Sequence, residues 1–121
     1  MKQDIGLLLM RLFFGGTMLI AHGAPKLMNF AQMKDRFPDP IGLGTSLSLG
    51  LVIFAEVICA ALVMLGVFTR YTVIPLIITM FVAVFIIHSA DPFGKMELGL
   101  AYMVAYIVIG LLGSGRFSLS K

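Results

Sequence analysis

The chain has 121 residues, of which 60% are hydrophobic and 12% are charged, and its mean hydropathy is +1.03. A soluble domain is typically about 45–50% apolar and about 25% charged, and a soluble fold of this length could not bury so much apolar surface. The net charge of +3 is dispersed along the chain, which argues against a nucleic-acid partner. Composition therefore indicates an integral membrane protein with one transmembrane domain, residues 1–121.

Four apolar stretches are long enough to cross a bilayer, since a spanning helix needs about 20 mainly apolar residues. They cover residues 5–24, 46–68, 72–90 and 96–113. The first is expected to end at Ala24, because Pro25 disfavours helical geometry in the residue before it. The segment 35–44 holds two prolines and two glycines and forms one longer loop, whereas short turns join the other spans. Pro75 is expected in the first turn of the third helix.

The sequence thus predicts an all-α, four-helix membrane bundle of up-down topology, with both termini on one side. The basic residues expected on that side are Lys2, Arg11, Arg70, Arg116 and Lys121, against Lys26, Lys34, Arg36 and Lys95 on the other. By the positive-inside rule, this excess of one places the termini in the cytoplasm.

Two charged residues interrupt the apolar spans, and such residues mark a function or a partner. Arg11 precedes His22 by eleven residues, which puts it about 16 Å below the outer end of the first helix. Glu56, in the inward-running second helix, lies about 15 Å below the same face. The matching depths predict an Arg11–Glu56 ion pair, which would leave neither charge unpaired in the bilayer.

A second polar group is expected at the outer membrane face, above this pair. It comprises His22, Lys26, His88, Asp91 and Glu97. Arg11, Gly15, His22 and Lys26 share one stripe of the first helix, which should face the bundle interior. The candidate ligands come from three separate segments without a tight spacing motif, so hydrogen-bonded histidines are favoured over a metal site. Cys59 is expected to be a small buried apolar residue.

The fourth helix carries two tyrosines among glycines on one face. The residues are Gly99, Tyr102, Tyr106, Gly110 and Gly113. Small residues allow close helix packing in lipid, so the face is interpreted as a packing seam. The alternative is that Tyr102 and Tyr106 line a ligand pocket.

Four segments of the sequence resemble the successive blocks of the DoxX family. They are LLLMRLFFGGTMLIAHGAPKL (7–27), FAEVICAALVMLGVFTR (54–70), FIIHSADPF (85–93) and ELGLAYMVAYIVIGLLGSGRFSLS (97–120). The resemblance implies a four-helix protein of a bacterial or archaeal plasma membrane. The related DoxD-type subunit belongs to an archaeal thiosulfate:quinone oxidoreductase, and other members are associated with redox and oxidative-stress complexes. The family's recurring polar positions correspond here to Arg11, His22, Lys26, Glu56, Arg70 and His88.

The leading functional hypothesis is a quinone-linked redox subunit or a binder of another lipophilic ligand. His22, Glu56 and His88 are the candidate catalytic residues, because they can supply hydrogen bonds and protons to a quinone. The surrounding polar network would comprise Arg11, Lys26, Arg70, Asp91, Glu97, Tyr102 and Tyr106. Electrons would come from a redox partner protein or directly from a substrate, and the chain could also form a homo-oligomer. The alternatives are a structural or assembly subunit of a membrane complex, and a small transporter or proton pathway.

Overall fold

The computed structural model describes residues 2–39, 42–87 and 92–119, and all the regular structure within these ranges is helical. Three helices are long and apolar enough to cross a membrane, namely Lys2–Met28, Thr45–Leu65 and Thr69–Ile87. A fourth apolar helix, Met96–Leu112, is shorter. The predicted all-α fold with four membrane helices is therefore confirmed.

The first span continues past the proline that was expected to end it. It consists of α1 (Lys2–Thr17), the π-helical segment η1 (Met18–Gly23) and α2 (Ala24–Met28), and it is followed by the short α3 (Phe30–Met33). A proline in a helix clashes with the carbonyl group four residues earlier and lacks an N–H donor. The wider turns of η1, placed directly before Pro25, accommodate that clash, as local π adjustments do in other membrane helices. The prediction that the first helix ends at Ala24 is wrong.

The second span is also interrupted by π-helical turns. It consists of α4 (Thr45–Ile53), η2 (Phe54–Cys59) and α5 (Ala60–Leu65). Asp39 fixes the start of α4, since its carboxylate accepts hydrogen bonds from the backbone of Leu43 and Gly44 and from the Ser48 hydroxyl. Gly66 ends α5 in a left-handed conformation with φ 73°. This is the conformation that glycine adopts without strain at a helix C-terminus.

The third and fourth spans form the second half of the molecule. They consist of α6 (Thr69–Val82) with the π-helical η3 (Ala83–Ile87), and α7 (Phe93–Leu112). Because α6 begins at Thr69 rather than at 72, Pro75 lies in the interior of the helix, and the prediction that it occupies the first turn is wrong. The Thr79 hydroxyl donates a hydrogen bond of 2.7 Å to the Pro75 carbonyl oxygen, four residues earlier in the same helix.

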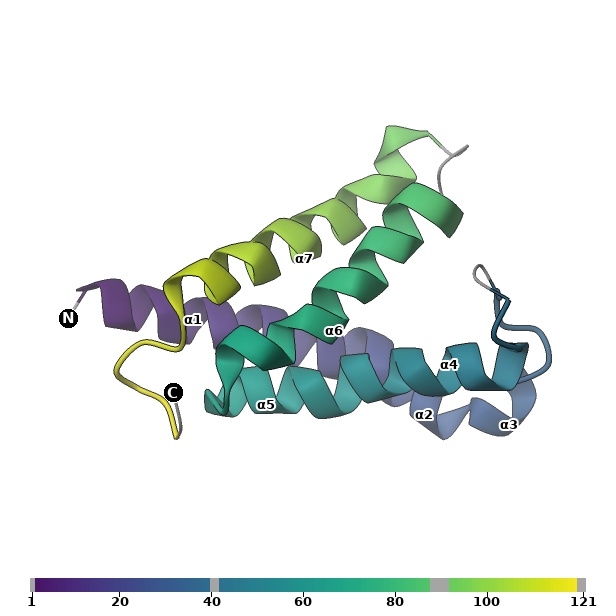
Figure 1. The fold of residues 1–121 in the computed structure, drawn as a ribbon, viewed down its shortest axis with the longest axis horizontal. Coiled ribbons are helices and arrows are strands. Elements are labelled where there is room, and N and C mark those ends of the chain that lie inside the picture. The colour runs from purple at the N-terminus through teal and green to yellow at the C-terminus, as the bar shows by residue number, and fades with distance from the viewer. Residues whose placement is uncertain (1, 40–41, 88–91, 120–121) are drawn as a thin grey trace.

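The helices form two antiparallel pairs that meet at one end and separate at the other (Figure 1). One pair is α1–η1–α2 against α4–η2–α5, and the other is α6–η3 against α7. The pairs contact each other through α1 with α7 and through α5 with α6, near the N- and C-termini. At the far end, η3 and the start of α7 lie well away from α3 and α4 (Figure 1). The bundle therefore opens towards that end.

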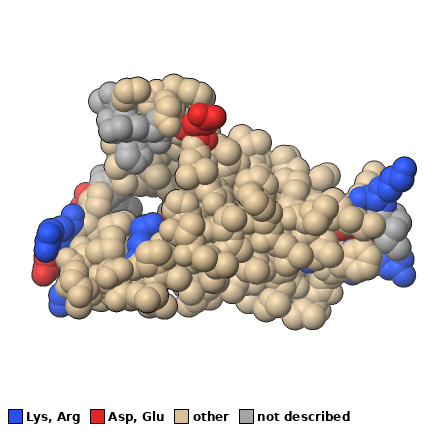
Figure 2. Space-filling model, turned by 180° about the vertical axis from the view of Figure 1, so that it is seen from behind, with Lys and Arg blue, Asp and Glu red and all other residues tan. Residues whose placement is uncertain are grey.

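A continuous apolar core fills the closed part of the bundle. Its fully buried members include Met18, Val63, Leu76, Tyr106 and Ile109. Large apolar side chains also cover the outer surface of every span, as expected where lipid surrounds the protein. Most of the surface seen in Figure 2 is accordingly uncharged, and the charged side chains gather towards its ends.

The glycine and tyrosine face of α7 is a packing seam, as the first interpretation held. Tyr102 and Tyr106 are buried. A Cβ atom at Gly99 would come within 2.7 Å of Val84, and one at Gly110 within 3.1 Å of Val73. The absence of side chains at these two glycines lets α7 lie close against α6 and η3.

The first two spans approach each other closely at Gly23. A Cβ atom there would lie 2.6 Å from the backbone carbonyl oxygen of Glu56, a distance that real Cβ atoms do not adopt. The neighbouring group is backbone, so it cannot rotate away as a side chain would. Gly23 therefore sets the separation between η1 and η2.

Gly23→Ala is expected to lower the free energy of unfolding by about 1–3 kcal/mol, because the added methyl group forces the two helices apart. Gly50→Ala is the matched control, since a Cβ atom at Gly50, in α4, would meet no other atom within 4 Å. Unfolding of both variants in detergent, followed by circular dichroism, checks this. Equal stability of the two variants would contradict the close contact at Gly23.

Candidate functional site

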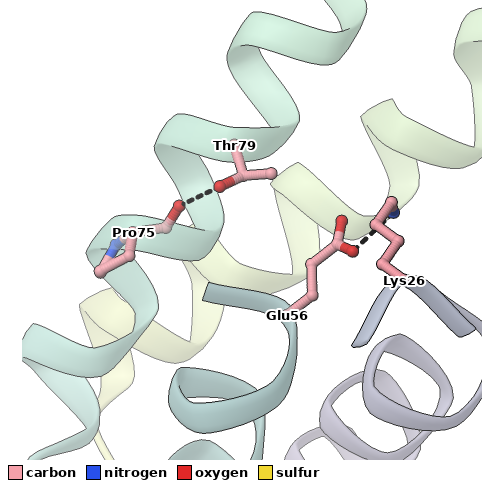
Figure 3. Close-up of polar contacts among 4 residues, drawn as sticks. All are labelled: Lys26, Glu56, Pro75 and Thr79. Atoms are coloured by element: carbon pink, nitrogen blue, oxygen red, sulfur yellow. Dashed lines mark hydrogen bonds and ion pairs between the residues drawn. The ribbon is translucent and has the colours of Figure 1, made fainter. Parts of the chain in front are cut away.

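Glu56 forms an ion pair with Lys26 between the first two spans. Its Oε1 atom lies 2.6 Å from Lys26 Nζ, and the side chains of Lys26 and Glu56 are 21% and 4% exposed. Figure 3 shows the two side chains pointing towards each other, with Thr79 of α6 on the other side of Glu56. The carboxylate is therefore enclosed by protein, whereas about one-fifth of the Lys26 side chain remains exposed.

The local backbone explains why these two residues meet. Gly23 brings η1 against the backbone of Glu56, and Lys26 follows Gly23 by three residues, about one turn further along the same helix. Lys26 is available at this level because the helix continues through Pro25. π-helical turns are frequent at functional sites, and here they contain Glu56 in η2 and His22 in η1.

His22 and Tyr102 form an aromatic wall next to the ion pair. Their rings meet edge to face with centroids 5.5 Å apart, and Tyr102 stacks on Tyr106 at 6.0 Å. The Tyr102 hydroxyl donates a hydrogen bond of 2.8 Å to the Thr17 hydroxyl oxygen, and that of Tyr106 donates one of 3.0 Å to the Phe14 carbonyl oxygen. Both tyrosine hydroxyls thus hold α7 against α1, and His22 packs against this pair of rings through Tyr102.

Arg11 does not pair with Glu56, so the predicted Arg11–Glu56 ion pair is wrong. Gly23 is level with Glu56, and Arg11 lies twelve residues earlier, about 18 Å along the helix. The prediction assumed that the first helix ends at Ala24, on the same surface at which the second begins. The helix instead runs on through α2 to Met28, and Lys26 lies at the level of Glu56 in place of Arg11.

Arg11 instead holds the C-terminal segment at the closed end of the bundle. Its side chain is 1% exposed, and its guanidinium donates hydrogen bonds of 2.5 Å to the carbonyl oxygens of Ser114 and Phe117. The Ser114 hydroxyl donates to that of Thr69, which joins the same segment to the start of α6. Arg11 therefore does not extend a polar route from Glu56 across the bundle.

The remaining predicted site residues lie apart from the ion pair or outside the described part of the chain. Arg70 is exposed at the closed end, where its guanidinium packs over Gly113. Glu97 is exposed on α7. His88 and Asp91 lie outside the described residues. In the described ranges, no group of three or more His, Cys, Asp and Glu side chains could hold a metal ion, and Cys59 is buried.

Three residues that matter for the site had no assigned role in the sequence-based prediction. Thr17 is the one hydroxyl-bearing residue between Lys2 and Met28, which was the available signal for it as a partner of Tyr102. Thr79 is one of several such residues in α6 and carried no comparable signal. Gly23 directly follows His22, and a small residue beside a polar one in a membrane helix is a signal of close helix contact.

These features define a multi-pass helical membrane protein with an ion pair buried where its two helix pairs begin to separate. The chain belongs to the DoxX family, whose family model matches residues 6–89. The chain is also 30% identical, over 95 residues, to an uncharacterized protein of Haemophilus influenzae; this similarity covers 74% of the chain and 63% of the relative. The match thus spans somewhat less than two thirds of that bacterial relative's length. No solved structure matches the chain.

Double-mutant cycles test the assignment of the ion pair. For Lys26→Met and Glu56→Gln, we expect a coupling energy of about 1–3 kcal/mol, because removing either partner leaves the other charge buried and unpaired. For Arg11→Met and Glu56→Gln, the losses should add within about 0.5 kcal/mol. Chemical unfolding in detergent measures both cycles, and a larger coupling for Arg11 than for Lys26 would contradict the assignment.

Proposed function

We propose that this protein binds a lipophilic ligand with a carbonyl or hydroxyl head group, of the quinone type, at the Lys26–Glu56 pair. The observation that carries the proposal is the unequal burial of the pair, since Glu56 is enclosed and Lys26 is one-fifth exposed. A lysine that neutralises a buried carboxylate and still reaches the exterior can also contact a ligand that arrives from the lipid.

The shape of the molecule supports entry of such a ligand. The two helix pairs diverge beyond the level of η2 (Figure 1), and the space-filling view shows a hollow between the separated ends (Figure 2). Apolar side chains, among them Ile78, Phe81 and Phe85, are exposed along α6 and η3. An isoprenoid or acyl tail could lie against this surface while its head group reaches the ion pair.

The chemistry of the pair suits both oxidation states of a quinone. The Lys26 ammonium group can donate a hydrogen bond to a quinone carbonyl oxygen, and the Glu56 carboxylate can accept one from a quinol hydroxyl. His22, beside the pair, is a further group that can exchange protons. We propose that electrons come from a redox partner protein. This chain then binds the quinone and supplies the side chains that exchange protons with it.

A structural role is the second candidate, because the ion pair joins two helices that already touch at Gly23. In that case the pair only fixes how the first two spans pack, as polar residues between membrane helices often do. The chain would then serve as an assembly subunit of a larger complex.

The double variant Lys26→Met/Glu56→Gln distinguishes the two roles, since it removes the pair without leaving a buried unpaired charge. We expect it to unfold much like the native protein but to bind a short-chain ubiquinone analogue at least about tenfold more weakly, the loss expected for one charged hydrogen bond. Isothermal titration calorimetry in detergent measures this.

Glu97→Gln is the matched control for that measurement, because Glu97 is an exposed glutamate on α7. It should leave the quinone affinity unchanged. Native quinone affinity in the folded double variant would contradict the proposed function and favour the structural role.

A further inference from the structure

The closed end of the bundle carries a second site, on the opposite side of the molecule from the Lys26–Glu56 pair. A cavity of about 610 Å³ lies there, which we call the terminal cavity. It is lined by Asp4 of α1, Arg70 of α6, Leu112 of α7, and the Gly113–Arg116 segment that follows α7. Three separate parts of the chain therefore place two guanidinium groups around one opening.

The fold fixes the side chain of Arg70 and the backbone of Arg116 beside the cavity. The Arg70 side chain packs over the turn after α7, where a Cβ atom at Gly113 would lie 3.3 Å from Arg70 Nε. The backbone N–H of Arg116 donates a hydrogen bond of 3.0 Å to Asp4 Oδ1, which ties this segment to the start of α1. The two side chains themselves remain exposed.

A third positive charge lies directly behind the wall of the terminal cavity. Arg11 Nη1 donates to the carbonyl oxygen of Ser114, and Ser114 lines the cavity. Within the described residues, Arg11 contacts carbonyl oxygens and no carboxylate, and its Nε atom has no hydrogen-bond partner. The positive charges of Arg11, Arg70 and Arg116 therefore exceed the single negative charge of Asp4, and the terminal cavity favours an anion.

An apolar groove continues from the terminal cavity along α1. It has a volume of about 540 Å³ and shares Asp4, Leu112 and Gly115 with the cavity. Its other lining residues are Gln3, Gly6, Leu7 and Met10. No atom lies within 4 Å of a Cβ position at Gly6, so the groove is open there.

We propose that the terminal cavity and the α1 groove together bind one anionic phospholipid. The phosphate group lies between Arg70 and Arg116, because guanidinium groups form strong charge-assisted hydrogen bonds with phosphate. One acyl chain lies in the groove beside Gly6. Anionic lipids are concentrated in the cytoplasmic leaflet. Binding of such a lipid at this end of the molecule therefore favours the orientation with both chain termini on the cytoplasmic side.

Native mass spectrometry of the full-length protein with dioleoyl phosphatidylglycerol and dioleoyl phosphatidylcholine tests the proposal. The native protein is expected to prefer phosphatidylglycerol, and Arg70→Gln or Arg116→Gln should each reduce that preference about fivefold. Lys34→Gln is the matched control, because Lys34 is exposed at the opposite end of the molecule, and it should leave the preference unchanged. An equal loss in Lys34→Gln would show general surface attraction and overturn the proposal.

Gly6→Leu tests the acyl groove separately from the arginines. The new side chain should fill the open space, weaken binding of both lipids, and leave the ratio between them unchanged. Inorganic phosphate in excess should not displace phosphatidylglycerol. Displacement by phosphate would indicate a site for a free anion, and a dimer that Gly6→Leu dissociates would indicate a second copy of the chain in the groove. Either result would overturn the lipid assignment.

Discussion

A carboxylate within an apolar membrane bundle requires a cation at its own level, and in this protein that requirement links most features of the first two spans. Lys26 meets Glu56 at 2.6 Å only because the first helix continues beyond Pro25. The π-helical turns of η1 permit that continuation, and Gly23 allows the backbones to approach closely enough for the contact. Loss of any of these features would leave Glu56 as an unpaired buried charge, which is strongly unfavourable in a medium of low dielectric constant.

The polar residues of the bundle fall into two groups rather than one continuous route. The Lys26–Glu56 pair lies where the helix pairs separate, beside His22 and the tyrosines of α7. Arg11 lies at the closed end, where it binds the backbone of the C-terminal segment. This separation allows distinct roles, with ligand chemistry proposed at the open end and attachment to anionic lipid proposed at the closed end.

Composition and apolar run length were enough to predict the membrane class and the four helices, and helical periodicity was enough to predict the packing face of α7, because these depend on patterns summed over many residues. The partner of Glu56 could not be predicted, since it depends on how far one helix slides along another. Glu56 lies level with Gly23, which is twelve residues or about 18 Å along the helix from the predicted partner Arg11. No pattern in a single sequence predicts the π-helical turns that allow the helix to continue past Pro25. The terminal cavity could not be predicted from the sequence either, because it depends on contacts between residues more than one hundred positions apart, such as Asp4 and Arg116.

The enclosed carboxylate of Glu56 is the centre of the proposed ligand site, and that role depends on its pairing with Lys26. Magic-angle-spinning NMR of the protein in lipid bilayers, with ¹⁵N-labelled lysine and arginine side chains and ¹³C-labelled glutamate, measures this pairing directly. We predict a strong through-space correlation between Lys26 Nζ and the Glu56 carboxyl carbon, and a change in the chemical shifts of these two atoms when a short-chain ubiquinone analogue is added. A correlation from Glu56 to the Arg11 guanidinium instead would contradict this pairing.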